Sequence, residues 1–140
     1  MDLPWAISHV LDRHQGALVT IQGDGRPQLT HIAYAMDDHG VARISITDGR
    51  VKTRNLRRDP RALLHVSGEG FWDYVVLDGT VELSAVASDP HDAATDELVD
   101  LYRAISGEHP DWEDYRRAMV QDGRLVARFR ADRAYGVARS

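Results

Sequence analysis

The sequence contains no cysteine, so disulfides, thiolate nucleophiles and cysteine-based zinc or iron–sulfur sites are excluded. It also lacks any apolar run approaching the roughly 18 residues of a membrane span. Acids, proline and histidine occupy the start, MDLPWAISHVLDRH, where a signal peptide needs a basic beginning and an apolar stretch. These absences predict a cytoplasmic protein without a membrane partner.

Motifs for phosphate binding and catalysis are missing as well. Neither G-x-G-x-x-G nor G-x-x-x-x-G-K-[ST] occurs, and G-x-S-x-G is absent. The seven histidines fit no zinc spacing, so no metal is expected. Acidic pairs such as Glu108 and Asp111, or Glu113 and Asp114, sit where carboxylates stabilise the start of a helix. The catalytic residues stay unknown, and redox chemistry would have to come from a bound cofactor.

The length and composition are those of a single globular domain. A chain of 140 residues has room for one core, which gives one predicted domain spanning 1–140. Hydrophobic residues make up 43% and charged residues 28%, which is ordinary for a folded protein.

The charge is distributed unevenly along the chain. Six cations and one anion lie between Arg50 and Arg61, and because the whole chain carries −5, the rest of it carries −10. Nucleic-acid binders usually spread basic charge over a whole face, so a basic island in an acidic protein favours a phosphorylated small molecule. The alternative is a solvated helix whose charges bind nothing.

Hydrophobic periodicity predicts strands that alternate with short helices. The expected helices cover residues 4–14, about 48–58, 90–107 and 112–121, with Thr47 or Asp48 capping the second. The expected strands cover residues 17–22, 27–36, 41–47, 61–67, 73–84 and 124–131, with a bulge at Asp78 and Gly79. This order predicts a mainly β (α+β) fold, a small antiparallel barrel with helical inserts, and argues against a parallel sheet.

The segment TDGRVKTRN, residues 47–55, is the candidate phosphate site. It places capping hydroxyls, free N–H groups and cations at one helix N-terminus, where the helix dipole attracts anions. We expect the phosphate to contact Arg50, Lys52, Thr53 and Asn55, although a purely structural helix is the alternative. Lys52 is the only lysine of the chain. The later arginines of the island would reach solvent, a partner chain or an anionic tail.

Some histidines and aromatic residues are further candidates. His31 and His65 lie in predicted strands and could line a pocket, although strand histidines more often pack or sit at an edge. Trp72 and Tyr74 begin a predicted strand and could present flat surfaces to an aromatic ring, although aromatic residues in strands more often belong to the core.

Four segments resemble a known family. They are DGRPQLTHIAY, ITDGRVKTRNLRRDPRALLHV, GTVELS and LYRAISGEHPDWEDYRRAMV. They are similar to the split β-barrel flavin and deazaflavin oxidoreductases related to pyridoxamine 5′-phosphate oxidase, and most of all to the actinobacterial subgroup that uses the 5-deazaflavin coenzyme F420. The most specific blocks are KTRNLRRDPR at residues 52–61 and EHPDWEDYRRAM at residues 108–119.

This resemblance implies a split antiparallel barrel of the FMN-binding type and a homodimer with two cofactor sites at the subunit interface. It implies that the ring system runs beside the second strand, with the end of the third strand nearby, while the basic helix takes the phosphate. Trp72 would come from the second chain. The implied cofactor-binding residues are Pro27, Gln28, Leu29, Thr30, Ser45, Thr47, Arg50, Lys52, Thr53, Asn55, Arg57 and Trp72.

The expected activity is hydride transfer between reduced coenzyme F420 and an unsaturated small molecule. Arg54, Arg57, Arg58 and Arg61 offer more positive charge than one phosphate requires, which favours F420 and its oligoglutamate tail over FMN. The alternatives are an FMN-dependent oxidase or reductase, and a non-enzymatic protein that binds F420 or a tetrapyrrole. His31, Ile32 and Ala33 would face the substrate, whose identity the resemblance does not carry over.

Overall fold

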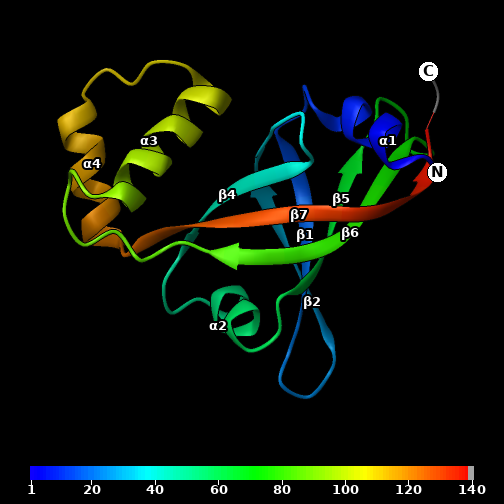
Figure 1. The fold of residues 1–140 in the computed structure, drawn as a ribbon, viewed down its shortest axis with the longest axis horizontal. Helices are drawn as coiled ribbons and strands as arrows, with labels where there is room; N and C mark the ends of the chain where they lie inside the picture. The colour runs from blue at the N-terminus through cyan, green and yellow to red at the C-terminus, as the bar shows by residue number, and fades with distance from the viewer. Residues whose placement is uncertain (139–140) are drawn as a thin grey trace.

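The computed structural model describes residues 1–138, which form one curled antiparallel sheet and four helices (Figure 1). None of these helices has the length and apolar character to cross a membrane. The elements follow the chain as α1 (Leu3–Val10), β1 (Gln15–Ile21), β2 (Pro27–Ala33), β3 (Ala35–Met36), β4 (Val41–Thr47), α2 (Val51–Arg58), β5 (Arg61–Ser67), β6 (Tyr74–Leu83), α3 (Ala93–Ser106), α4 (Trp112–Asp122) and β7 (Arg124–Val137).

The seven strands are hydrogen-bonded in the order β2-β1-β5-β6-β7-β4-β3. The sheet curls so that β2 and β4 contact each other across the open side without main-chain pairing. A mainly β split barrel was predicted from the sequence, and this architecture confirms it. The bulge expected at Asp78 and Gly79 is also present, as a register shift against β7.

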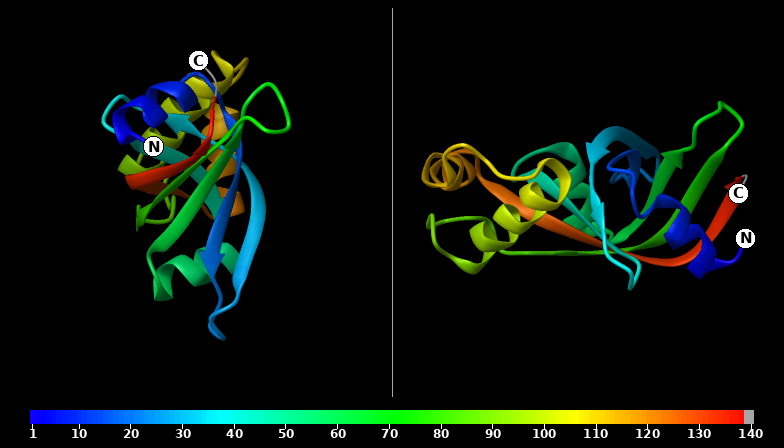
Figure 2. Two further views of the ribbon diagram at one scale, coloured as in Figure 1. Left: turned by 90° about the vertical axis from the view of Figure 1, so that its right-hand side faces the viewer. Right: turned by 90° about the horizontal axis from the view of Figure 1, so that it is seen from above.

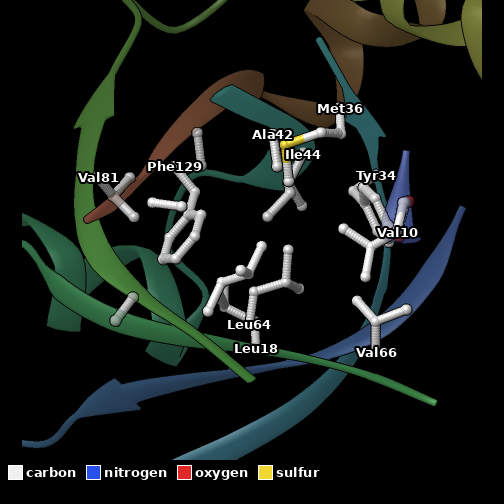
Figure 3. Packing of buried hydrophobic residues seen from close by; sticks show 14 of the residues in the cluster. Val10, Leu18, Tyr34, Met36, Ala42, Ile44, Leu64, Val66, Val81 and Phe129 are labelled. Carbon is white, nitrogen blue, oxygen red and sulfur yellow. Dashed lines mark hydrogen bonds between the residues drawn. The ribbon is translucent and has the colours of Figure 1, made fainter. Parts of the chain in front are cut away.

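The inside of the curl holds the main hydrophobic core. Buried side chains converge from α1 (Val10), β1 (Leu18), β4 (Ile44), β5 (Leu64) and β7 (Phe129), as Figure 3 shows. Each strand places alternate residues in this core, because successive side chains point to opposite faces. The two helices α3 and α4 pack instead on the other face of the sheet, where Leu98 meets Val126.

Several element boundaries differ from the predictions. The expected strand 27–36 is divided at Tyr34, whose buried ring lies under α1 and whose hydroxyl donates to the Val10 carbonyl at 2.7 Å. The last strand continues to Val137 because it pairs with β6 along its length, including past the polar pair at residues 132–133. The third helix begins at Ala93 and not at 90, because Asp92 is its cap and accepts from Thr95 N at 2.8 Å.

The outer face of β2, β1, β5, β6 and the end of β7 has none of the four described helices packed over it, and it exposes several large apolar side chains. Strand pairing aligns Leu29 with Val19, and Tyr135 with Val76, on this face. Leu29 is 60% exposed and Tyr135 is 51% exposed. The views in Figures 1 and 2 show α3 and α4 at the other end of the sheet, beside β4 and the start of β7. A broad uncovered surface is therefore left on the side that bears β2.

Candidate functional site

The N-terminus of α2 is open to a ligand. The helix follows the turn after β4, where Gly49 adopts a φ of +85°. Its N-cap is Arg50 and not Thr47 or Asp48, and the Arg50 side chain makes no capping hydrogen bond. The first N–H groups of a helix have no acceptor within the helix, so without a side-chain cap they remain available to an anion.

Three cations gather at this helix start. Burial, followed by the charges of Arg50 and Arg124, lowers the pKa of Lys52 below its ordinary value of 10.5. Arg124 begins β7 and pairs with Thr47 at the end of β4, and its Nε is buried without a hydrogen-bond partner within residues 1–138. We call Arg50, Lys52 and Arg124 the cationic cluster. Like charges held together in this way are stabilised when an anion binds between them.

The other arginines of the basic island already have partners. Arg57 pairs with Asp48 at 2.6 Å, and Arg61 pairs with Asp59 at 2.7 Å. Arg58 donates to the Ile21 carbonyl at 2.9 Å, and Arg54 donates to the Gly49 carbonyl at 2.5 Å. These arginine side chains are exposed, so solvent screens their contacts, and the contacts exchange readily for a ligand.

Thr53 and Asn55 make hydrogen bonds inside the fold. The Thr53 side chain is fully buried, and its hydroxyl donates to the Thr47 carbonyl at 2.7 Å. Asn55 is also buried, and its Nδ2 donates to Thr20 Oγ1 at 3.1 Å, while that hydroxyl lies 3.3 Å from Gln28 Oε1. A structural role therefore accounts for both residues, since Thr53 connects α2 to the end of β4 and Asn55 connects it to β1 and, through Thr20, to β2. Their predicted contact with phosphate stays a prediction.

The remaining β-strand candidates lie on β2 and β4. Because β2 is an edge strand, the main-chain groups on its outer side have no strand partner. Pro27 and Leu29 are exposed on one face of β2, whereas Gln28 and Thr30 are half-buried on the other, and Thr30 Oγ1 lacks a hydrogen-bond partner in the described chain.

Ser45 on β4 pairs with Val126, next to the pair formed by Thr47 and Arg124. Ser45 and Thr47 therefore share the sheet face of the cationic cluster. Arg124 also acts on Tyr115 of α4, whose pKa is raised to about 12 by burial and lowered to a smaller extent by this guanidinium. Tyr115 thus keeps its proton at neutral pH, and its hydroxyl donates to the Leu98 carbonyl at 3.1 Å.

Trp72 lies away from α2, in the loop between β5 and β6 at the opposite end of the sheet (Figures 1 and 2). It is 72% exposed and packs edge-on against Phe71, with 4.8 Å between the ring centroids. Within one chain it does not join the other candidates, so its contribution from a second chain stays a prediction.

A cleft of about 870 Å³ opens where β2 ends and β1 begins. His31 and His65 both line it, so of the two alternatives for these strand histidines the structure favours the lining of a pocket. Of the predicted cofactor-binding residues, Leu29 lines this cleft. We call it the histidine cleft. It lies toward the Ala33 end of β2, whereas the hydrogen bonds of Asn55 connect α2 to the strand near Gln28.

The sequence analysis missed Arg124. It stands 72 positions after Lys52, at the start of a strand, and no local motif surrounds it. Only the pairing of β4 with β7 brings it beside the helix start. The one signal in the sequence was that Gly123-Arg124 follows a helix and opens the final strand.

The curled antiparallel sheet of seven strands, with four helices, defines a split-barrel protein. The family model of pyridoxamine 5′-phosphate oxidase matches residues 7–138, and the chain belongs to this family.

Solved structures of similar proteins share the fold at low identity. A conserved hypothetical protein from Mycobacterium tuberculosis is 24% identical, with a TM-score of 0.70 over 96% of this chain and 82% of that one. A structure described as an F420 reductase is 23% identical, with a TM-score of 0.68 over 91% and 94% of the two chains. A heme storage protein from Vibrio cholerae is 12% identical, with a TM-score of 0.67 over 96% and 93%.

Proposed function

We propose that this chain is an oxidoreductase that uses coenzyme F420 and reduces an unsaturated small molecule. The observation that carries this proposal is the cationic cluster at the start of α2, where Arg50, Lys52 and Arg124 meet without an acidic partner in the part of the chain that the structure describes. A phosphodiester would bind there through charge-assisted hydrogen bonds to the side chains and to the free helix N–H groups.

The residues present suit a phosphorylated ring coenzyme. The buried Nε of Arg124 has no acceptor, and the phosphate oxygens would supply one. The free edge of β2 would hydrogen-bond the ring through its main chain, beside Leu29 and Thr30. When bound, the coenzyme supplies hydride transfer, and the chain supplies its binding, its orientation and the electrostatic surroundings.

A homodimer is part of the proposal. The uncovered face carries Leu29, Tyr135 and Val137, each more than half exposed. Large exposed apolar patches in soluble proteins mark interaction surfaces. A second copy packed over the Tyr135 and Val137 end of this face would bury those two side chains and bring Trp72 toward its partner's site. Light scattering of the native chain and of Tyr135→Asp tests this, with a dimer expected for the first and a monomer for the second; a native monomer would contradict it.

The choice of F420 over FMN rests on charge. Arg54, Arg57, Arg58 and Arg61 are exposed, and an oligoglutamate tail could replace their weak internal partners. A solved F420 reductase of similar fold supports this choice. The matching family model supports FMN as the alternative, and the similar heme storage protein supports a non-enzymatic tetrapyrrole binder.

Fluorescence titration with F420 and with FMN tests the proposal. We expect F420 to bind more tightly, and Lys52→Ala to weaken its binding by about 10-fold to 100-fold, since a charge-assisted contact contributes about 1.5–3 kcal/mol. Arg117→Ala is the matched control, because it removes an exposed cation from α4. Tighter FMN binding, or a protein purified yellow with flavin, would favour the alternative.

Turnover separates an enzyme from a binding protein. Reduced F420 is mixed with a panel of enones and quinones, and its reoxidation is followed by absorbance. A coenzyme that binds but is not consumed with any member of the panel would contradict the enzymatic role.

A further inference from the structure

The histidine cleft has an unusual charge composition for this chain. The whole sequence contains 22 acidic residues, yet none of them lines the cleft. Three basic side chains do line it, namely Arg13, His31 and His65. A concave site lined by a guanidinium and two imidazoles, with no carboxylate among its lining residues, favours an anion, although the Asp73 carboxylate lies behind Gly68 at its margin.

Arg13 is the fixed positive charge of this cleft. It lies in the connection from α1 to β1 and is half-buried. Its guanidinium has neither an acidic nor a hydrogen-bonding partner in residues 1–138, whereas Arg128 makes ion pairs with both Glu82 and Glu97. Arg13 also lines an adjoining cavity of about 590 Å³, whose lining includes Trp72 and two acidic residues, Glu69 and Asp73, neither of which forms an ion pair with Arg13 within residues 1–138. A guanidinium presents two parallel N–H groups that match a carboxylate.

The shape of the cleft suits a flat molecule. Gly16 and Ala17 line it with little side-chain bulk, and a β-carbon at Gly16 would lie only 2.7 Å from the His65 carbonyl oxygen. Strand pairing places His31 and His65 on either side of Ala17. Directly paired side chains on neighbouring strands are about 5 Å apart, so the two imidazoles flank the shallow position between them. Ile32 adds an apolar side to the cleft.

We propose that the histidine cleft binds a planar organic carboxylate, with Arg13 holding the carboxylate and the conjugated body lying along Ala17 between His31 and His65. The role of this cleft as the substrate site of the oxidoreductase rests on the proposed function, and it restricts the substrate to an unsaturated acid. Its binding of a carboxylate depends only on the residues of the cleft.

Calorimetric titration of the protein without coenzyme tests the binding, with trans-cinnamate as the probe and the uncharged cinnamamide as its matched analogue. Cinnamate should bind at least about tenfold more tightly than the amide. Arg13→Gln should remove that preference, and Arg13→Lys should restore part of it, because lysine keeps the charge but loses the planar fork. Arg26→Gln, at the exposed tip of the β1–β2 hairpin, is the matched control and should leave both affinities unchanged.

The outcomes separate this inference from the proposed function. Equal affinity for acid and amide, no detectable cinnamate binding, or unchanged preference in Arg13→Gln would overturn the inference. Melting temperatures of the variants exclude unfolding as the cause of a loss. F420 titration of Arg13→Gln should give the wild-type affinity, since Arg13 lies outside the cationic cluster. If cinnamate binds through Arg13 but neither coenzyme binds, the proposed function is contradicted, whereas the carboxylate site in the histidine cleft is supported.

Discussion

Two groups of cationic side chains beside one face of the sheet differ in whether a carboxylate pairs with them. Under α3, Arg43 and Arg128 both donate to Glu97, with Nε to Oε2 distances of 3.1 and 2.7 Å. The cationic cluster at the other end of the same strand pair has no such carboxylate among the residues that the structure describes. Thr47 and Arg124 mark that end, only four residues along each strand from Arg43 and Arg128.

This difference shows which charges the fold uses and which it leaves for a ligand. Glu97 is a half-buried residue of α3, and hydrogen bonds from the two guanidiniums, first that of Arg128, hold its pKa below the usual range against the opposing effect of burial. At the cationic cluster, burial and then repulsion by Arg50 and Arg124 lower the pKa of Lys52, and no carboxylate within residues 1–138 offsets them. An unsatisfied cluster of cations is therefore the stronger indication of a binding site.

The largest expected effect is on stability. Glu97→Ala leaves two half-buried guanidiniums without their carboxylate, so we expect a loss of about 2 kcal/mol in the free energy of unfolding. Urea denaturation measures it. Glu82→Ala removes the exposed partner of Arg128 and should cost less than about 0.5 kcal/mol. Equal losses in the free energy of unfolding for Glu97→Ala and Glu82→Ala would show that the half-buried carboxylate stabilises the fold no more than the exposed one does.

The next effect is on coenzyme binding. Arg124→Ala should weaken F420 binding about tenfold, because it removes one charge-assisted contact. It should leave the free energy of unfolding almost unchanged, since the Nε of Arg124 has no partner to lose within residues 1–138. Fluorescence titration and urea denaturation of one preparation give both numbers. A large loss of stability with unchanged affinity would assign Arg124 to the fold.

The pH dependence of the same titration should report Lys52. Below its folded-state pKa the ammonium is charged and binds the phosphate, so F420 affinity falls as the pH rises through that value, in a window that begins below pH 10.5. The free energy of unfolding changes in the opposite direction. The unfolded chain binds the Lys52 proton more tightly than the folded chain does, so the destabilisation from burying a charged ammonium near Arg50 and Arg124 is relieved as the pH rises. Lys52→Met should lose both trends, and a variant that retained them would refute the assignment.

The smallest expected effect is that of Arg57. Because Arg57 already pairs with Asp48 at the surface, Arg57→Ala should weaken F420 by only about twofold and leave FMN binding unchanged. Parallel titrations with the two coenzymes measure this. A tenfold loss with both would place the phosphate at Arg57 and remove the distinction between paired and unpaired cations.

Much of the fold could be predicted because its signals are local. Alternation of apolar residues identified β4 and β5 with their observed bounds, and Asp111 caps α4 as expected, accepting from Asp114 N at 3.1 Å. The end of β7 could not be predicted, because main-chain pairing with β6 carries it past a polar stretch that would end an isolated strand.

The candidate site was predicted only where residues adjacent in sequence form it. Lys52 and Arg50 stand together at the helix start, but the burial of Thr53 and Asn55 depends on how α2 packs against β1. Arg124 reaches the site through strand pairing alone. Charge patterning indicates the candidate anion site, and tertiary packing decides which of its side chains lack partners within residues 1–138.

The most direct test of the anion site is a crystal structure of the chain grown with coenzyme F420. We predict that the phosphodiester lies within hydrogen-bond distance of Arg50, Lys52 and Arg124, with the ring along β2. A phosphodiester bound elsewhere on the chain, with these three side chains facing only solvent, would contradict this account.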